Sequence, residues 1–219
     1  LLERALETIP LGSQTFSKSY IQYPQNTSPM FLTHGQGSHV WDADGNEYID
    51  LGSGLLPVIL GYNDPDVNQA IQNQLSKGIS FSLSTELEIE LAEKLCEIIP
   101  SAEKVRFAKN GTDVTSAAIR IARAYTGREK VIVCGYHGWQ DWYIGSTTRN
   151  KGVPKSTSQL TTIIPYNDLE GAKELLKTKA YAGLILEPCN ATFPNNDYLS
   201  ALKKLCEQNG TLLIFDEVI

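Results

Sequence analysis

Short apolar runs alternate with helix-like stretches over most of the chain after Thr85. The runs KVIVCG (130–135), AGLILEP (182–188) and TLLIFDEV (211–218) have the length and composition of buried strands. Between them, stretches such as DYLSALKKLCEQNG (197–210) place apolar residues at helical spacing. Alternation of this kind is typical of βα units, so we predict an α/β fold with a mostly parallel sheet and flanking helices.

The N-terminal part of the chain has a different texture. The segment SHVWDADGNEYIDL (38–51) consists of two short alternating runs around an Asp-Gly pair, which predicts a β-hairpin. Residues 10–29 are rich in Ser, Gln and Pro and have no period, so we expect an arm. We therefore divide the chain into an N-terminal arm with a small β segment (1–60) and the first part of a larger domain (61–219). The larger domain is expected to be incomplete, since a strand-like run reaches the end of the sequence.

Composition and charge argue against several classes of protein. Hydrophobic residues make up 42% and charged residues 20% of the 219 residues, as in ordinary globular proteins. The net charge of -6 argues against nucleic acid or an anionic membrane as a partner. No apolar run approaches the roughly 20 residues needed to cross a bilayer, and the N-terminus lacks a secretion signal, so we expect a cytoplasmic protein. The four cysteines form no C-x-x-C pair, so neither a metal site nor a disulfide set is expected.

A helix with an open start is predicted within FAKNGTDVTSAAIRIARAYTG (107–127). Apolar residues recur there at helical spacing, and the final glycine is a typical stop. Asn110 and Thr112 are good N-cap residues, and Gly111 has no side chain to block approach. An open helix N-terminus attracts anions, phosphate above all, so these three residues are a candidate phosphate site. An ordinary capped helix is the alternative interpretation.

Three chemically active side chains directly follow predicted strands. Tyr136, Glu187 and Asp216 each come after an apolar run, and the carboxyl ends of parallel strands gather at one edge of a sheet. A pocket there would combine an anion-binding helix start, an aromatic side chain and acids. Pyridoxal phosphate (PLP), a flat cationic ring with a phosphate, suits such a pocket. A buried carboxylate needs a partner, which makes Asp216 the main candidate, whereas Tyr136 could instead be a core aromatic. The tryptophans are interpreted as packing residues: Trp41, Trp139 and Trp142.

Six motifs occur in a fixed order nearly from end to end of the chain: IPLGSQTFSKS, GSHVWDADGNEYIDL, PVILGYNDPDVNQAI, VRFAKNGTDVTSAAIRIARAYTGREKVIVCGYHGWQD, LILEP and LLIFDEV. In content and order they resemble the class III aminotransferases of fold type I, and most of all the branch that contains glutamate-1-semialdehyde aminomutase. One such motif would be weak, whereas six in order are specific. The resemblance implies a fold type I PLP-dependent transferase: a large domain, truncated here, with an N-terminal arm and a small β-hairpin segment.

The resemblance also implies which residues bind the cofactor. Asn110, Gly111 and Thr112 stand where the family's Ser-Gly-Thr holds the phosphate. Tyr136 matches the aromatic residue stacked on the ring. His137 accompanies it, either in a supporting role or as a merely buried histidine.

The implied catalytic residues are two acids. Asp216 matches the acid at the ring nitrogen, and Glu187 matches an acid near the cofactor hydroxyl and the substrate. Val218 matches the aliphatic residue against the opposite ring face. Glu217 is expected to point away from the pocket, because successive side chains of a strand alternate.

Departures from the family's pattern concern the substrate. Thr15 and Lys18 align where the aminomutases have a Ser and an Arg that grip the substrate carboxylate, and Leu55 aligns with a substrate-site Trp. A lysine lacks the planar fork that binds a carboxylate through two bonds, which puts the aminomutase substrate in doubt. The resemblance places the Schiff-base lysine beyond Ile219, so the 219 residues alone are not expected to turn over.

These features predict that the full-length protein transfers an amino group between an amine or amino acid and a carbonyl compound with PLP as cofactor. If both groups belong to one molecule, the same chemistry makes an aminomutase. The resemblance implies a homodimer with small-molecule substrates, and neither nucleic acid nor a membrane is expected as a partner. Two alternatives stay open: a binding module that keeps the fold without the chemistry, and a nucleotide-binding Rossmann-like enzyme, although no G-x-G-x-x-G follows a strand.

Overall fold

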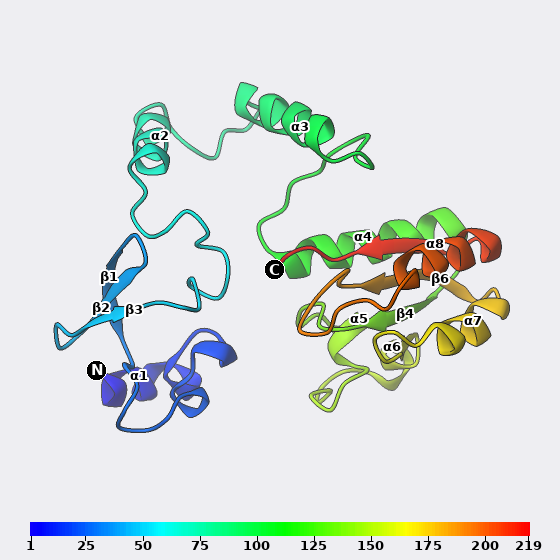
Figure 1. The fold of residues 1–219 in the computed structure, drawn as a ribbon, viewed down its shortest axis with the longest axis horizontal. Helices are drawn as coiled ribbons and strands as arrows, with labels where there is room; N and C mark the ends of the chain where they lie inside the picture. The colour runs from blue at the N-terminus through cyan, green and yellow to red at the C-terminus, as the bar shows by residue number, and fades with distance from the viewer. The chain divides into compact units, whose positions relative to one another are not determined.

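The computed structural model describes residues 1–219, which form two compact units, Leu1–Thr85 and Glu86–Ile219 (Figure 1). The boundary between the units lies later than residue 60, where the texture of the sequence changes. The difference arises because the helix at Pro65–Leu75 belongs to the first unit. The division into the domains 1–60 and 61–219 stays a prediction.

The first unit contains a three-stranded antiparallel sheet of order β1-β2-β3. Its elements are α1 (Leu2–Thr8), 3₁₀ turns at Pro10–Gly12, Phe16–Lys18 and Tyr20–Gln22, β1 (Leu32–Gln36), β2 (His39–Asp42), β3 (Glu47–Ile49) and α2 (Pro65–Leu75). The expected hairpin is confirmed, because β2 pairs with β3. In its turn, the Asp42 carboxylate accepts bonds from the backbone amides of Asp44 (2.9 Å) and Asn46 (2.8 Å), which fix the turn's shape.

The second unit contains a four-stranded sheet of order β5-β4-β6-β7, in which every neighbouring pair of strands is parallel. Its elements are α3 (Glu86–Ile98), α4 (Gly111–Thr126), β4 (Lys130–Cys134), α5 (Asp141–Ile144), α6 (Lys155–Ser158), β5 (Thr161–Ile163), α7 (Leu169–Lys177), β6 (Tyr181–Leu186), α8 (Tyr198–Asn209) and β7 (Leu212–Phe215). The predicted alternation of strands and helices is confirmed, and with it the α/β class.

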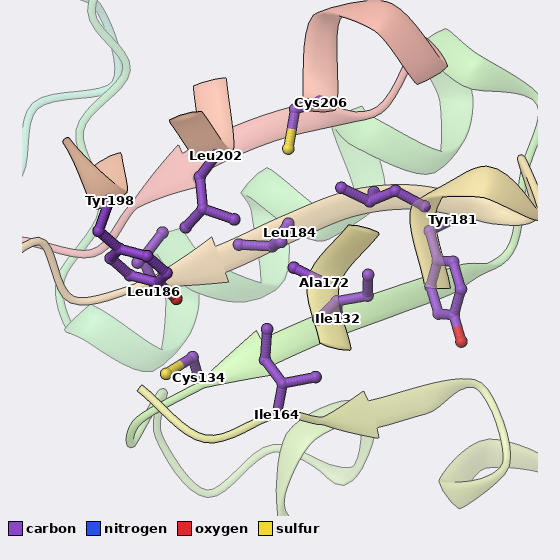
Figure 2. Packing of buried hydrophobic residues seen from close by; sticks show 11 residues of the cluster. Ile132, Cys134, Ile164, Ala172, Tyr181, Leu184, Leu186, Tyr198, Leu202 and Cys206 are labelled. Atoms are coloured by element: carbon purple, nitrogen blue, oxygen red, sulfur yellow. The ribbon is translucent and has the colours of Figure 1, made fainter. Parts of the chain in front are cut away.

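Helices cover both faces of this sheet. Along β4, Ile132 and Cys134 belong to a buried cluster with α7 and α8, while Val131 and Val133 belong to a second cluster with α4 and α5. This alternation follows from the two-residue period of a strand. Figure 2 shows the first cluster, in which Leu202 of α8 points toward the strands. With both faces covered, the chemically active side chains that follow the strands are left at the carboxyl edge of the sheet.

Three short helices lie where no helix was predicted. α5 and α6 have four residues each and lie in the polar loop that follows β4, and such lengths leave no helical period to read. The seven-residue α1 opens the chain. None of the helices combines the length and the apolar character needed to span a bilayer.

Candidate active site

A cavity of about 410 Å³ opens at the carboxyl end of the second unit's sheet. Four segments form its walls: the start of α4 and the loops that follow β4, β6 and β7. Eight residues singled out from the sequence line these walls: Asn110, Gly111, Thr112, Tyr136, His137, Glu187, Asp216 and Val218. The fold therefore gathers in one cavity groups that the sequence spreads from position 110 to position 218.

The first turn of α4 is arranged to receive an anion. Asn110 is the N-cap residue, and the Asp113 carboxylate accepts hydrogen bonds from its backbone amide (3.1 Å) and its side-chain amide (3.3 Å). The first amides of a helix have no acceptor inside the helix, and the macrodipole makes this end positive. The Thr112 hydroxyl oxygen is buried here and has no hydrogen-bond partner. A bound phosphate would satisfy both the hydroxyl and the amides.

A buried histidine–aspartate pair also lines the cavity. The side chains of His137 and Asp216 are 0% and 6% exposed, and His137 Nδ1 lies 2.8 Å from Asp216 Oδ2. On the other side of the ring, His137 Nε2 lies 3.1 Å from the Cys134 carbonyl oxygen. The Cys134 carbonyl can only accept, so Nε2 carries a proton that it donates there. The contact at Nδ1 holds one further proton between His137 and Asp216, which ties the two side chains together.

Asp216 keeps acceptor capacity for a ligand. A carboxylate has about four acceptor positions. Besides the bond with His137, the structure shows one from the Val218 backbone amide to Asp216 Oδ1 at 3.2 Å. The Val218 side chain packs against Gly111, so the loop after β7 meets the start of α4. Asp216 can therefore accept a hydrogen bond from a protonated ring nitrogen without losing its pairing with His137.

Two glycines let the cavity walls approach each other closely. Gly138 has φ +101°, and a Cβ there would lie 2.5 Å from Thr112 Oγ1. Gly135 has φ +105°, and a Cβ there would lie 2.7 Å from Glu187 Oε2. Any other residue would meet both backbone strain and a steric clash at these positions. The Glu187 carboxylate therefore occupies a space that only a glycine leaves free.

The aromatic residues and Thr115 in the cavity wall only partly agree with the interpretation of the sequence. Trp139 is 68% exposed and lines the cavity, so the prediction that it packs in the interior is wrong, while Trp142 is buried. Tyr136 is 59% exposed and meets Tyr143 edge-on at 5.7 Å between ring centroids. Thr115, also in the wall, donates its hydroxyl to the His137 carbonyl (3.1 Å) and ties α4 to the loop after β4. Two sequence signals could have identified these two residues as part of the site. Thr115 lies at helical spacing on α4, and Trp139 directly follows Tyr-His-Gly.

Burial keeps the neighbouring thiol and phenol protonated. Burial and, to a smaller extent, the Glu187 carboxylate raise the pKa of the Cys134 thiol to about 11. Burial also raises the pKa of the Tyr143 phenol, with smaller contributions from Tyr136 and Glu187. Tyr143 donates its hydroxyl to the Gly135 carbonyl (2.9 Å), which helps to hold the loop after β4 in place.

These residues fit PLP, the cofactor that the resemblance implies. The unpartnered Thr112 hydroxyl and the open α4 start suit a phosphate, and Asp216 suits a protonated ring nitrogen. Tyr136 and Val218 are both exposed beside them and offer contacts for a flat ring. A cavity of about 410 Å³ is of the size used for small ligands.

The three residues predicted to contact the substrate belong to the first unit. Lys18 and Leu55 line a cavity of about 810 Å³ in that unit, and Thr15 does not. Leu55 has a positive φ of 66°, which is uncommon for a leucine. The contact of these residues with a substrate stays a prediction.

The fold and the cavity together define an α/β protein with a site for a phosphorylated, ring-containing ligand. The chain belongs to the class III aminotransferase family, because the sequence model described as Aminotransferase class-III matches residues 20–219. The resemblance seen in the six motifs is thereby confirmed.

Curated relatives match the whole of this chain. The glutamate-1-semialdehyde 2,1-aminomutase of Natronomonas pharaonis is 39% identical over 234 residues, which cover 100% of this chain and 52% of the relative. The 3-aminobutyryl-CoA aminotransferase of Cloacimonas acidaminovorans is 37% identical over 227 residues, which cover 100% of this chain and 54% of the relative. The chain therefore spans about half the length of the curated relatives it matches.

Solved structures share the fold. The omega-transaminase from Sphaerobacter thermophilus superposes with a TM-score of 0.89 at 31% identity, over 100% of this chain and 54% of the other. A transaminase solved with PLP bound gives a TM-score of 0.87 at 30% identity, over 97% of this chain and 53% of the other. The predicted fold, that of the fold type I PLP-dependent transferases, is thereby confirmed.

Proposed function

We propose that the full-length protein transfers an amino group between an amine or amino acid and a carbonyl compound, with PLP as cofactor. One observation carries the proposal: the buried His137–Asp216 pair and the open start of α4 line the same cavity. Membership of the class III aminotransferase family and the similarity to a transaminase with PLP bound support it.

Binding in this cavity is divided among short segments. The first amides of α4, at Gly111 and Thr112, would bind the phosphate together with the unpartnered Thr112 hydroxyl. Tyr136 and Val218 line the same cavity and would contact the ring. When bound, PLP supplies an electron-accepting ring that stabilises the charge left at the amine carbon when one of its bonds breaks.

The His137–Asp216 pair controls one proton. With PLP bound, the Asp216 carboxylate would accept a hydrogen bond from the ring nitrogen and would keep the proton on that nitrogen. His137 cannot turn away from Asp216 without also losing its bond to the Cys134 carbonyl, so the carboxylate stays in place. Glu187 has the role that the resemblance implies, near the cofactor hydroxyl and the substrate.

At the substrate end, we assign Thr15, Lys18 and Leu55 of the segment 1–60 to contact with a small amine or carbonyl molecule. Lys18 offers a carboxylate a point charge rather than a two-bond fork. We further infer a cytoplasmic homodimer. Intramolecular transfer is a second candidate, because the relatives include an aminomutase as well as an aminotransferase.

The proposal is tested with full-length protein loaded with PLP and a panel of amine donors and carbonyl acceptors, with products separated by chromatography. An aminomutase needs no separate acceptor, which distinguishes the two candidates. Asp216→Asn should lower kcat by about 100-fold or more, because the proton on the ring nitrogen loses its anionic partner. Glu217→Gln, the adjacent carboxylate outside the cavity wall, is the matched control and should keep its activity.

Two results would contradict the proposal. Full activity in Asp216→Asn would remove the role of the His137–Asp216 pair. Binding of PLP without transfer from any donor would leave the non-catalytic binding module as the function.

A further inference from the structure

Residues 188–197 lead from β6 to α8, and hydrogen bonds from the segment that follows β5 hold them in place. We call these residues the Glu187 loop, since Glu187 directly precedes them. The Tyr166 hydroxyl donates a hydrogen bond to the Pro188 carbonyl at 2.6 Å. The Asn167 side chain donates to the Phe193 carbonyl (3.1 Å) and accepts from the Asn195 amide (2.8 Å). All three bonds come from the two residues Tyr166 and Asn167, which follow β5.

Because of the strand order, these three hydrogen bonds connect the loops that follow β5 and β6. β4 pairs with β5 on one side and with β6 on the other, so the loops after β5 and β6 meet across the end of β4. Tyr136 and His137 follow β4 at the same edge of the sheet. The three bonds therefore join two loops on either side of the segment that lines the cavity.

Few contacts hold the Glu187 side chain itself in place. Its carboxylate accepts one bond from the Asn190 side chain, at 3.3 Å. Its Oε2 atom fits only because Gly135 has no Cβ, which would lie 2.7 Å away. The position of the carboxylate thus depends on the path of the backbone at Glu187 and Pro188, and the hydrogen bond to the Pro188 carbonyl fixes that path.

The fastening side chains are themselves held in place. Tyr166 packs against the cluster shown in Figure 2, and its ring meets Tyr198 edge-on at 5.5 Å between centroids. Asn167 has φ +67°, and both ends of its side-chain amide bind the Glu187 loop. Because Tyr166 and Asn167 are held in place themselves, they can fix the position of the Glu187 loop as well as stabilise it.

We propose that Tyr166 and Asn167 are positioning residues that hold Glu187 in the cavity through the Glu187 loop. The importance of that position rests on the proposed function, whereas the fastening itself does not. Loss of the Tyr166 hydroxyl frees the Pro188 carbonyl, and Glu187 then moves with a loosened loop.

The fastening is tested by hydrogen exchange, read by mass spectrometry, on the full-length protein without cofactor. In Tyr166→Phe, the hydrogen-bonded amides of this loop, Thr192 and Asn195, should exchange about fivefold faster, the factor that one lost neutral hydrogen bond corresponds to. Asn167→Gly should give a larger increase, since it removes two bonds and still adopts a positive φ. Tyr181→Phe is the matched control, because its hydroxyl meets Thr162 at the amino end of β6 and its loss should leave these amides unchanged. Unchanged exchange in Tyr166→Phe would overturn the proposal.

The positioning role is tested by a double-mutant cycle on PLP-loaded enzyme. Tyr166→Phe should lower kcat/KM in the native background but have no further effect in Glu187→Gln, because it acts through the Glu187 carboxylate. An equal loss in both backgrounds would mean a general structural effect and would overturn the positioning role. The exchange result needs no activity, so it separates a failure of this proposal from a failure of the proposed function.

Discussion

The His137 side chain shows how this chain satisfies a polar ring in its interior. The ring is enclosed, lies 6.5 Å from the Trp142 ring between centroids, and meets an acceptor at each nitrogen. A buried polar ring is tolerated only when its hydrogen-bonding atoms have partners. The Cys134 carbonyl and Asp216 together meet that condition.

Removing the imidazole should therefore be costly. In His137→Phe, the Asp216 carboxylate is left buried without its partner, and the free energy of unfolding should fall by about 3–5 kcal/mol. Urea denaturation of the full-length protein at neutral pH measures the loss. The control is His39→Phe, which breaks the exposed pair with Glu47 (2.7 Å) and should cost less than about 1 kcal/mol. Similar losses in the two variants would contradict the pairing described for His137.

The cysteines should differ sharply in reactivity. Burial raises the pKa of Cys206 to about 12, and burial with the nearby Glu187 raises that of Cys134 to about 11. The thiolate is the reactive form, so at pH 8 both buried thiols stay protonated and unreactive. Iodoacetamide should label exposed Cys189 first, and labelling of Cys134 and Cys206 should require urea. Peptide mass spectrometry measures the order, and native labelling of Cys206 at the rate of Cys189 would refute it.

Among the elements, α4 both packs on the sheet and forms part of the cavity wall. Its buried side chains, among them Ile119 and Ala122, pack on the sheet, while its first turn forms a wall of the cavity. The loop after β4 approaches that turn closely at Gly138. A change in the loop should therefore affect the ligand site.

The variant Gly138→Ala tests this approach. Its Cβ would lie 2.5 Å from Thr112 Oγ1, so the first turn of α4 or the loop must move, and PLP affinity should fall by about tenfold or more. Gly152→Ala is the control: it also has a positive φ, of +87°, but a Cβ there meets nothing within 4 Å. Gly152→Ala should cost about 1 kcal/mol of stability and leave PLP affinity unchanged. Calorimetric titration with PLP compares the two, and equal affinities would contradict the close contact.

Regular elements could be predicted because burial imposes a period on them. The strands β4, β6 and β7 and the helix α8 were expected, since short apolar runs and helical spacing survive in the sequence. The cavity residues Tyr136, Glu187 and Asp216 followed from the same reasoning, because chemistry gathers where parallel strands end. The sequence therefore indicated both the sheet and its functional edge.

The loop after β4 was less predictable. α5 and α6 are too short to show a period, and the side on which Trp139 lies depends on backbone turns at Gly135 and Gly138. The fastening of the Glu187 loop by Tyr166 and Asn167 could not be foreseen either, because it depends on contacts between distant segments. Local patterns contain no information on such contacts.

For the molecule as a whole, the first unit makes part of the stability sensitive to acid. In the first unit, the Asp50 carboxylate accepts the Tyr62 hydroxyl (2.6 Å) and the Gly54 amide (2.8 Å). The Tyr62 hydroxyl is the largest cause that lowers the pKa of Asp50, and the Gly54 amide adds to it. The carboxylate form is thus favoured by folding of this unit.

The sign of the pH effect follows from that direction. The pKa of an Asp in an unfolded chain is about 3.9. The stability that Asp50 contributes is therefore present above that pH, and it is lost as the pH falls through the lower pKa of the folded state. Asp50→Asn should destabilise the protein at pH 6, and its difference from the native protein should shrink toward pH 3. Thermal unfolding across this range measures the difference, with Asp44→Asn as an exposed control. A difference that stays constant with pH would contradict the role of the Asp50 charge.

The walls of the ligand cavity have a consequence for how the protein is made. They are drawn from residues between Asn110 and Ile219, and the segment with Asp216 is held in place when β7 pairs with β6. A ribosome must therefore release the chain beyond Val218 before the walls can meet. A nascent polypeptide shorter than that has no complete binding site, so the vitamin-derived cofactor can bind only after β7 has joined the sheet.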